Sequence, residues 1–308
     1  MKKQILFIGI LSLCFAYNSF CQTSEKSKIS FSFDDGSVKD FPGYKLERWN
    51  RMLLNHLKKH DVKAVLFVKG SGVDNPKGES VVSSWDSLGH LIGNHTYKHA
   101  YFNSNKISLD FFKADMLKND SLIAKYKNYR KLFRFPYLKE GNTIEKRDGF
   151  RAFLKEKNYR IGHVTIDASD WYVDKRLVQE LKDNPATDLK EYKAFYLDHI
   201  VERALFYDSL AFELTGRKIK HNLLLHHNLS AALFLDDLIE RFKEIGWEII
   251  DAEEAYTDEI YKREPQNIPA GESLIWALAK QSGKYEELLR YPAEDSRYEK
   301  AKMDDLGL

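Results

Sequence analysis

The chain has 308 residues, of which 43% are hydrophobic and 31% are charged, the composition of an ordinary folded protein rather than of a disordered or fibrous one. The formal net charge is +2, and without Lys2 and Lys3 it is 2 − 2 = 0. A balanced charge excludes the broad basic surface that nucleic-acid binding requires, so we expect no nucleic-acid partner.

The first 21 residues predict a cleavable secretory signal. Two lysines precede an apolar run at residues 5–17, and small side chains stand at positions 19 and 21, just before Gln22. The run is too short for a membrane span. A lipoprotein anchor through Cys14 or Cys21 is disfavoured because the residues before each lack the usual pattern. We expect an exported protein, periplasmic or extracellular, whose mature chain has no disulfide and no stable membrane insertion.

Between residues 29 and 250, strand-like runs alternate with amphipathic, helix-like runs. The predicted strands are residues 29–33, 62–68, 91–93, 132–135, 160–166, 223–226 and 247–250, and the predicted helices are residues 44–60, 109–129, 144–157 and 233–245. A βα alternation of this kind implies a parallel sheet covered by helices. In such folds the active site lies at the carboxyl ends of the strands.

Two segments fall outside this alternation. Residues 177–218 carry apolar side chains at helical spacing and predict two or more extra helices, which we expect to form part of the wall rather than a cover over the cleft. After Ala255 the strand signals stop, and residues 257–308 predict a helical extension with a short helix at 273–281 and a charged tail. We therefore divide the chain into a signal at 1–21, a catalytic domain at 22–256 and an extension at 257–308.

The first chemical motif is Asp34-Asp35-Gly36, at the end of the first strand, followed some distance on by His95 and His99. By itself, Asp-Asp-Gly is ordinary turn chemistry, and two histidines four positions apart are common on a surface. Together they offer two carboxylates and two imidazoles. A catalytic metal site uses three protein ligands and keeps one position open for water, which leaves one carboxylate as a base.

Three further motifs stand where predicted strands end. These are Arg134-Phe135-Pro136-Tyr137, the segment from Asp167 to Trp171, and Leu224-Leu225-His226. Arg134 could form a surface ion pair, and His226 could be a hydrogen-bonded core histidine. Their common position at strand ends favours a shared site instead.

With these five motifs in order, the chain resembles the polysaccharide deacetylases of the NodB-homology type, carbohydrate esterase family four, over roughly residues 28–256. The family's T-F-D-D-G is similar to Ser32-Phe33-Asp34-Asp35-Gly36, and its H-[ST]-x-x-H to residues 95–99. Its R-x-P-Y is similar to residues 134–137, its D-x-x-D-W segment to residues 167–171, and its L-x-H to residues 224–226. The resemblance implies an α/β fold, a distorted incomplete (β/α) barrel, here with extra helices and the C-terminal extension.

The resemblance also implies a metal site. Asp35, His95 and His99 would bind a divalent ion, most simply zinc, although the same ligands suit cobalt, nickel or iron. Asp34 would be the general base, held ionised and oriented by Arg134.

The remaining roles concern the leaving group and the acetyl group. His226 would protonate the departing group, with Asp170 keeping it charged. The backbone N–H of Tyr137 would stabilise the oxyanion, and Trp171 and Leu224 would wall the acetyl pocket.

Two departures from the family pattern are visible. Ser32 replaces threonine, which touches the strand and not the chemistry. His227 stands where many relatives carry aspartate, and there we expect altered behaviour of His226 and altered substrate contacts.

Three functions follow as hypotheses. The first is a secreted, metal-dependent hydrolase that removes acetyl groups from N-acetylated oligo- or polysaccharides such as chitooligosaccharides or peptidoglycan. The second is an O-acetyl esterase on a polysaccharide such as xylan, because the motifs do not separate amide from ester. The third is a catalytically silent carbohydrate-binding protein, against which the retention of Asp34, Arg134 and His226 counts. The sequence gives no expectation about oligomeric state.

Overall fold

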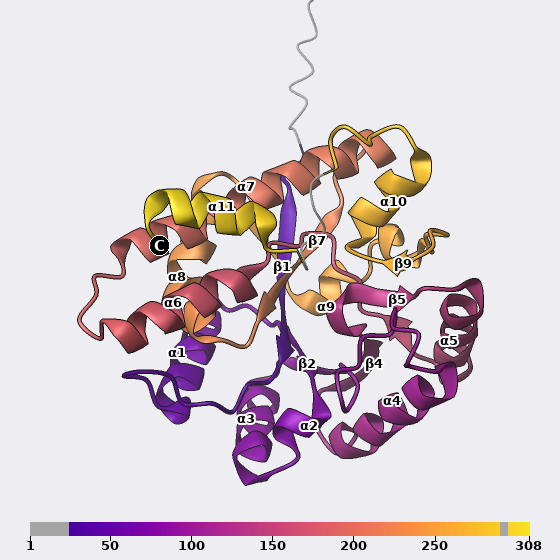
Figure 1. Ribbon diagram of the computed structural model, residues 1–308, viewed down its shortest axis with the longest axis horizontal. Coiled ribbons are helices and arrows are strands. Elements are labelled where there is room, and N and C mark those ends of the chain that lie inside the picture. Colours follow the sequence, from indigo (N-terminus) through magenta and orange to yellow (C-terminus); the bar gives the residue numbers. More distant parts are fainter. Residues whose placement is uncertain (1–24, 290–294) are drawn as a thin grey trace, which may run out of the picture.

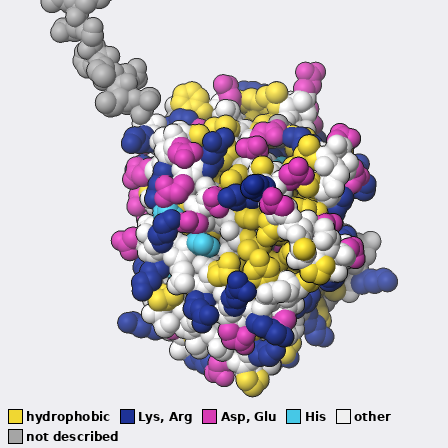
Figure 2. Space-filling view, turned by 90° about the vertical axis from the view of Figure 1, so that its left-hand side faces the viewer, with side chains coloured by type: hydrophobic (Ala, Val, Ile, Leu, Met, Phe, Trp, Pro, Cys, Tyr) yellow, Lys and Arg dark blue, Asp and Glu magenta, His cyan; other side chains and the backbone are white. Residues whose placement is uncertain are grey.

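The computed structural model describes residues 25–289 and 295–308. The predicted secretory segment, with both cysteines, lies outside these residues. In the described part, a central sheet is surrounded by helices (Figure 1). Among the described helices, none combines the length and the apolar character that a membrane crossing requires. On the side shown in Figure 2, acidic and basic side chains are interspersed.

The central strand of the sheet is β1 (Lys28–Asp35), which pairs in parallel with β2 on one side and with β7 on the other. The strand order is β6-β4-β3-β2-β1-β7, and β8 pairs with the start of β1. The other strands are β2 (Val65–Val68), β3 (Leu91–Asn94), β4 (Tyr129–Phe133), β6 (Arg160–Ile161), β7 (Lys220–His226) and β8 (Glu248–Ile249). All these pairings are parallel, so the predicted α/β class with a parallel sheet is confirmed.

The sheet curls until its two ends approach each other, without closing into a full barrel. The strand predicted at residues 160–166 is wrong in length, because β6 ends after two residues. There Gly162 lies against Phe67, so close that a Cβ would come within 2.4 Å of a ring atom. The chain then leaves β4 and crosses towards β7, where Ile166 forms a single parallel bridge with Leu223. The result is a distorted, incomplete barrel.

The predicted helices are present, with shifted ends. The longer helices are α1 (Leu46–Lys59), α3 (Pro76–Ser87), α4 (Leu109–Ile123), α5 (Ile144–Glu156), α6 (Asp170–Asp183), α7 (Lys190–Thr215) and α8 (Leu229–Glu244), and two short ones are α2 (Gly70–Val73) and α9 (Ala252–Ala255). The helix predicted to continue to residue 129 ends at Ile123. The Asp86 carboxylate accepts the backbone N–H groups of Lys127 (3.2 Å) and Asn128 (2.7 Å) and fixes the turn before β4.

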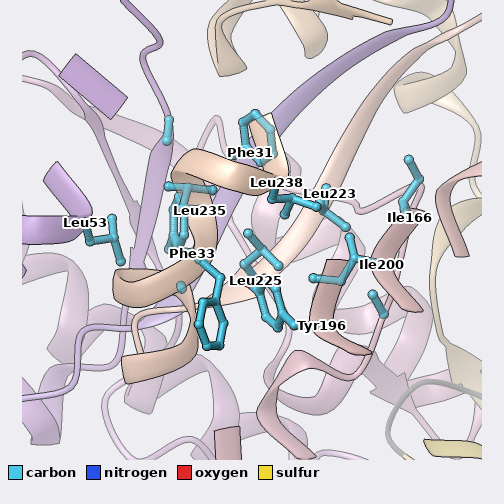
Figure 3. Packing of buried hydrophobic residues seen from close by; sticks show 14 of the residues in the cluster. Phe31, Phe33, Leu53, Ile166, Tyr196, Ile200, Leu223, Leu225, Leu235 and Leu238 are labelled. Carbon is cyan, nitrogen blue, oxygen red and sulfur yellow. The ribbon is translucent and has the colours of Figure 1, made fainter. Parts of the chain in front are cut away.

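Side chains alternate across β1, and both of its faces are buried. Phe31 and Phe33 point outward into the main core, where they meet residues of α7 and α8 (Figure 3). Ser30 and Ser32 point into the barrel, where Ser32 Oγ donates to Asn222 Oδ1 at 2.8 Å. Because the side-chain period of a strand is two, Asp34 continues the inward face. The outward face stabilises the sheet, and the inward face leads to the carboxyl ends of the strands.

The extra segment at residues 177–218 contains the end of α6 and all of α7, as predicted, and α7 packs on α8 and on α10 (Leu274–Ser282) as a wall helix. After Ala255 the expectation of no further strands is wrong. Residues Ala270–Gly271 (β9) pair antiparallel with Lys139–Gly141 (β5), which follows a 3-10 turn at Pro136–Leu138. A two-residue strand carries no periodicity, so the sequence could not indicate it.

The charged tail contains a further helix, α11 (Arg297–Leu306), which lies over α6 and α7 (Figure 1). Its Met303 and Glu299 are buried. Glu299 Oε1 lies 3.4 Å from His199 Nε2 of α7. On α6, Arg176 donates to Asp304 at 2.7 Å and also to the backbone carbonyl of Leu308. These contacts hold α11 on the barrel wall.

Glu299 makes the attachment of α11 dependent on pH. Burial raises the pKa of Glu299 to about 7 from 4.5, although Arg203 opposes the shift. A raised carboxyl pKa favours the folded state below pH 4.5, and this contribution is lost as the pH rises through 7. We expect Glu299→Gln to remove on the order of 1–3 kcal/mol of this pH dependence, measured as the free energy of unfolding at pH 5 and pH 8. The exposed Glu213→Gln is the matched control, and equal pH dependence in wild type and Glu299→Gln would contradict the assignment.

Candidate metal and catalytic site

The ends of β1 and β7 place a carboxylate beside an imidazole. Asp34 stands opposite His226 in the parallel register of the two strands. The backbone N–H of His227 donates to the carbonyl of Asp34 at 3.1 Å and extends the pairing by one residue. Directly after Asp34 the chain turns, with positive φ at Asp35 (80°) and Gly36 (77°). Because of this turn, the Asp35 carboxylate lies at the mouth of the barrel and not in the outer core.

The loop after β3 brings two histidines to the same place. The His95 backbone N–H donates to Val68 of β2 at 3.0 Å, and Thr96 and His99 adopt positive φ. The motif therefore forms a tight turn. The donor atoms of Asp35, His95 and His99 all lie within 4.8 Å of one another. The structure thus brings together the three residues that were predicted to be metal ligands.

The hydrogen bonds of these three residues fit a cation. His95 Nδ1 lies 2.9 Å from the carbonyl oxygen of Arg134, which can only accept, so Nδ1 carries the proton and Nε2 presents a lone pair. His95 Nε2 lies 3.1 Å from His99 Nε2 and close to Asp35 Oδ1, a buried oxygen with no hydrogen-bond partner. The lone pair of His95 Nε2, the neighbouring His99 Nε2 and an unsatisfied carboxylate oxygen converge in a way that suits a divalent ion.

The charge states also fit. Burial lowers the pKa of His95 and of His99 to about 3, so both imidazoles are neutral near pH 7. Burial opposes ionisation of Asp35, but His99 and Lys69 together hold the pKa of this carboxyl well below its usual range. Neutral imidazoles and an ionised carboxylate are the ligand forms that a metal requires.

Asp34 is buried beside the ligands and pairs with Arg134. Its two carboxylate oxygens accept from Arg134 Nη1 at 3.1 and 3.2 Å. Burial raises the pKa of Asp34, and the Arg134 guanidinium opposes the rise. Asp34 Oδ2 lies 3.5 Å from His95 Nε2, so it borders the group of ligands. A carboxylate held in one orientation with a raised pKa is the arrangement of a general base.

His226 differs from His95 and His99, because its pKa is raised and theirs are lowered. Its Nδ1 bonds Asp170 Oδ1 at 2.7 Å, and its backbone N–H donates to Asp170 Oδ2 at 2.9 Å. Asp170 is fully buried at the start of α6, and Asn228 also donates to it at 2.9 Å. Burial would lower the pKa of His226, but the Asp170 carboxylate raises it to about 10. His226 is therefore an imidazolium near pH 7, which can donate a proton from Nε2.

Of these residues, five line one cleft of about 850 Å³, namely Asp34, Asp35, His95, His99 and His226. Arg134 and Asp170 are buried and do not line it. Tyr137, Trp171 and Leu224, predicted to contact the oxyanion and the acetyl group, are all part of its lining. Tyr137 adopts φ 56°, and its ring lies 4.4 Å from that of His99. The structure thus brings together all ten residues predicted for the site, namely Asp34, Asp35, His95, His99, Arg134, Tyr137, Asp170, Trp171, Leu224 and His226.

The cleft also contains residues that the sequence analysis missed. Lys69 directly follows β2, and its Nζ lies 3.6 Å from Asp35 Oδ1. The rule that functional groups follow strand ends could have found it. Tyr101 follows the histidine motif and carried no signal of its own. Residues 295–297 lie in the charged tail, where no pattern pointed to the site.

The expectation for His227 is wrong. Its side chain is buried and points away from the cleft, 4.4 Å from the Trp49 ring, and its Nε2 lies 2.9 Å from Asn50 Oδ1. Successive side chains of a strand point to opposite faces, so the residue after His226 must face the outer core. His227 therefore contacts helix α1 and not the substrate.

Residues 22–153 match the sequence model of the family described as polysaccharide deacetylase. A peptidoglycan-N-acetylglucosamine deacetylase of Bacillus cereus is 29% identical over 158 residues, 51% of this chain and 50% of the relative. A chitin deacetylase of Arthroderma benhamiae is 27% identical over 154 residues, 49% of this chain and 37% of the relative. The match thus spans half or less of the length of these relatives. The resemblance to polysaccharide deacetylases is confirmed over these residues.

Solved structures show the same fold. A mutant CE4 family pseudoenzyme with restored enzymatic activity has a TM-score of 0.52 and 21% identity, over 75% of this chain and 67% of the other. A peptidoglycan N-acetylglucosamine deacetylase also has a TM-score of 0.52, with 20% identity over 75% of this chain and 88% of the other. The expected NodB-type incomplete barrel is therefore confirmed. The motifs at residues 167–171 and 224–226 lie beyond the residues that match the family model, and the barrel brings them to the same cleft.

The ligand set can be tested without any substrate. We expect His95→Ala to reduce zinc affinity at least tenfold, because it removes one of three ligands. His56→Ala, a histidine of α1 whose ring contacts the carbonyl of Ala232, is the matched control and should leave the affinity unchanged. Isothermal titration calorimetry with the chelator-treated protein measures both. Equal zinc affinity in wild type and His95→Ala would contradict the site.

Proposed function

We propose that the protein is a secreted, metal-dependent deacetylase that removes acetyl groups from N-acetylated sugars of a chitin- or peptidoglycan-like polysaccharide. One observation carries the proposal. The three candidate ligands lie between a carboxylate paired with an arginine, Asp34 with Arg134, and an imidazolium paired with a carboxylate, His226 with Asp170. Export follows only from the predicted signal in the sequence. The names of the relatives support the choice of substrate class.

The fold alone does not separate an enzyme from a silent relative, because the similar structures include a CE4 family pseudoenzyme from Bacillus anthracis. The retained side chains support the enzyme. A metal that serves only to stabilise the fold needs its three ligands. It needs neither the buried ion pair at Asp34 nor the imidazolium at His226.

When bound by Asp35, His95 and His99, a divalent ion would polarise the acetyl carbonyl and make water acidic enough to react near neutral pH. Asp34 removes the proton from the attacking water. Arg134 keeps the Asp34 carboxylate in one orientation, so no binding energy is spent on placing the base.

His226 and the cleft wall complete the reaction. The backbone N–H of Tyr137 stabilises the oxyanion that forms when water adds to the carbonyl. His226 then donates its Nε2 proton to the leaving nitrogen, while Asp170 holds Nδ1. Trp171 and Leu224 bound the space for the acetyl methyl group.

The reaction is tested by acetate release after chelation and addition of zinc or cobalt. We expect metal-dependent release from chitooligosaccharides or peptidoglycan, and none from O-acetylated xylan. Release from xylan alone would show that the protein is an O-acetyl esterase and not an N-deacetylase. No release from any of these, with zinc bound, would support a silent binding protein.

Asp34→Asn separates the base from the ligands. We expect this variant to keep wild-type zinc affinity and to lose at least 100-fold in kcat, because the amide cannot accept the proton from water. His95→Ala should lose both zinc and turnover. Zinc titration and acetate release on the same preparations measure the two properties. Loss of zinc from Asp34→Asn to the same degree as from His95→Ala would contradict the division of roles.

Asp170→Asn tests the proton donor. The Asp170 carboxylate raises the pKa of His226, so its removal should lower that pKa and leave less imidazolium near pH 7. Because the acid must be protonated, the basic limb of the pH profile of kcat/KM should move to lower pH, with a loss of about 10- to 1,000-fold at pH 8. An unchanged basic limb would show that His226 is not the acid.

A further inference from the structure

One wall of the catalytic cleft comes from the C-terminal segment, far beyond the residues that match the deacetylase family. Asp295, Ser296 and Arg297 line the same cleft as Asp34 and His226. Asp295 and Ser296 directly precede α11 and Arg297 is its first residue, and α11 lies over α6 and α7 (Figure 1). The site that the barrel builds is therefore bounded in part by this segment.

The contacts of α11 fix the position of this wall. Besides the buried Glu299 and Met303, two side chains of α11 hold one carboxylate of α7. Tyr298 Oη donates to Glu202 Oε1 at 2.8 Å, and Lys302 Nζ donates to Glu202 Oε2 at 2.7 Å. On the other side α11 contacts α6, the helix that begins at Asp170. The wall and the partner of the proton donor thus belong to one packed unit.

The chemistry of the wall suits a sugar. Arg297 Nε donates to Asp295 Oδ2 at 2.7 Å, and the backbone N–H of Arg297 donates to Asp295 Oδ1 at 3.0 Å. The pair holds an exposed guanidinium and a partly exposed carboxylate at the edge of the cleft. A guanidinium donates to hydroxyl and carbonyl oxygens, and a carboxylate accepts from hydroxyl groups.

Elsewhere in the same cleft the lining is aromatic. Tyr101 is 45% exposed and Tyr137 is 39% exposed. The centroids of their rings lie 5.6 Å apart. Such rings offer an apolar surface to the face of a sugar. The cleft has a volume of about 850 Å³. Pockets for drug-sized ligands have about 300–1,000 Å³, so this cleft has room for much more than one acetyl group.

We propose that residues 295–297 bind a sugar residue next to the one that loses its acetyl group, and so make the protein selective for oligosaccharides over single acetylated sugars. The inference rests on the proposed deacetylase function. It adds the C-terminal segment as a determinant of substrate length. Arg297 is the central donor of this contact, and Asp295 orients it.

The test compares a long and a short substrate in wild type and Arg297→Ala. For chitopentaose we expect KM to rise roughly three- to tenfold in the variant, the size typical of a lost charged contact at a partly exposed site. For N-acetylglucosamine and for a small aryl acetate, kcat/KM should stay at the wild-type value. Lys300→Ala removes a cation from the same helix, outside the cleft, and is the matched control. Unchanged melting temperatures confirm that both variants fold.

Two results would overturn the inference. One is an unchanged KM for chitopentaose in Arg297→Ala, and the other is an equal loss on long and short substrates. Should wild type release no acetate from any of them, the proposed function fails. In that event calorimetric titration of chitopentaose into both proteins decides the inference by itself. Weaker binding of chitopentaose to Arg297→Ala than to wild type supports a sugar contact at residues 295–297. Equal binding to both proteins, or no binding to either, rejects it.

Discussion

The buried guanidinium of Arg134 is the interaction on which the rest of the site depends. Its side chain is 1% exposed, and a charge at that depth is tolerated only with a partner. Asp34 supplies the negative charge, Ser32 accepts from Nη2 at 3.1 Å, and the Phe67 ring lies 4.3 Å below the guanidinium. The same residue's backbone carbonyl fixes the proton of His95 on Nδ1. One arginine thus orients both the candidate base and a candidate metal ligand.

The parallel sheet turns this local arrangement into a site. Parallel strands end on the same side, so residues far apart in sequence meet at one edge. The register of β1 with β7 sets Asp34 opposite His226, and the turn after Asp34 directs Asp35 to the histidine loop. At the same edge, Asp170 at the start of α6 lies 2.7 Å from His226 Nδ1. Base, ligands and acid therefore meet around one small volume without any long loop.

The residues of the site were predicted more accurately from the sequence than the ends of the strands and the C-terminal segment were. Four of the five motifs lie at or directly after the end of a strand, where a titratable group is unusual enough to be informative, as with His226 after Leu225. The fifth, at residues 167–171, follows only the isolated bridge between Ile166 and Leu223. The strand predicted at residues 160–166 failed because periodicity cannot show that Gly162 must pass close to Phe67. The side chain of His227 was misjudged because neighbouring residues were treated together, although a strand sends them to opposite faces. The wall at residues 295–297 depends on tertiary packing of α11, for which a charged tail gives no local signal.

The most direct test is a crystal structure of the zinc-loaded protein with anomalous data at the zinc edge. We expect one zinc ion held by Asp35, His95 and His99. We also expect Asp34 to remain paired with Arg134 and not to coordinate the metal. Zinc coordinated by Asp34, or bound elsewhere with the three ligands empty, would contradict the separation of base and metal site on which the proposed function stands.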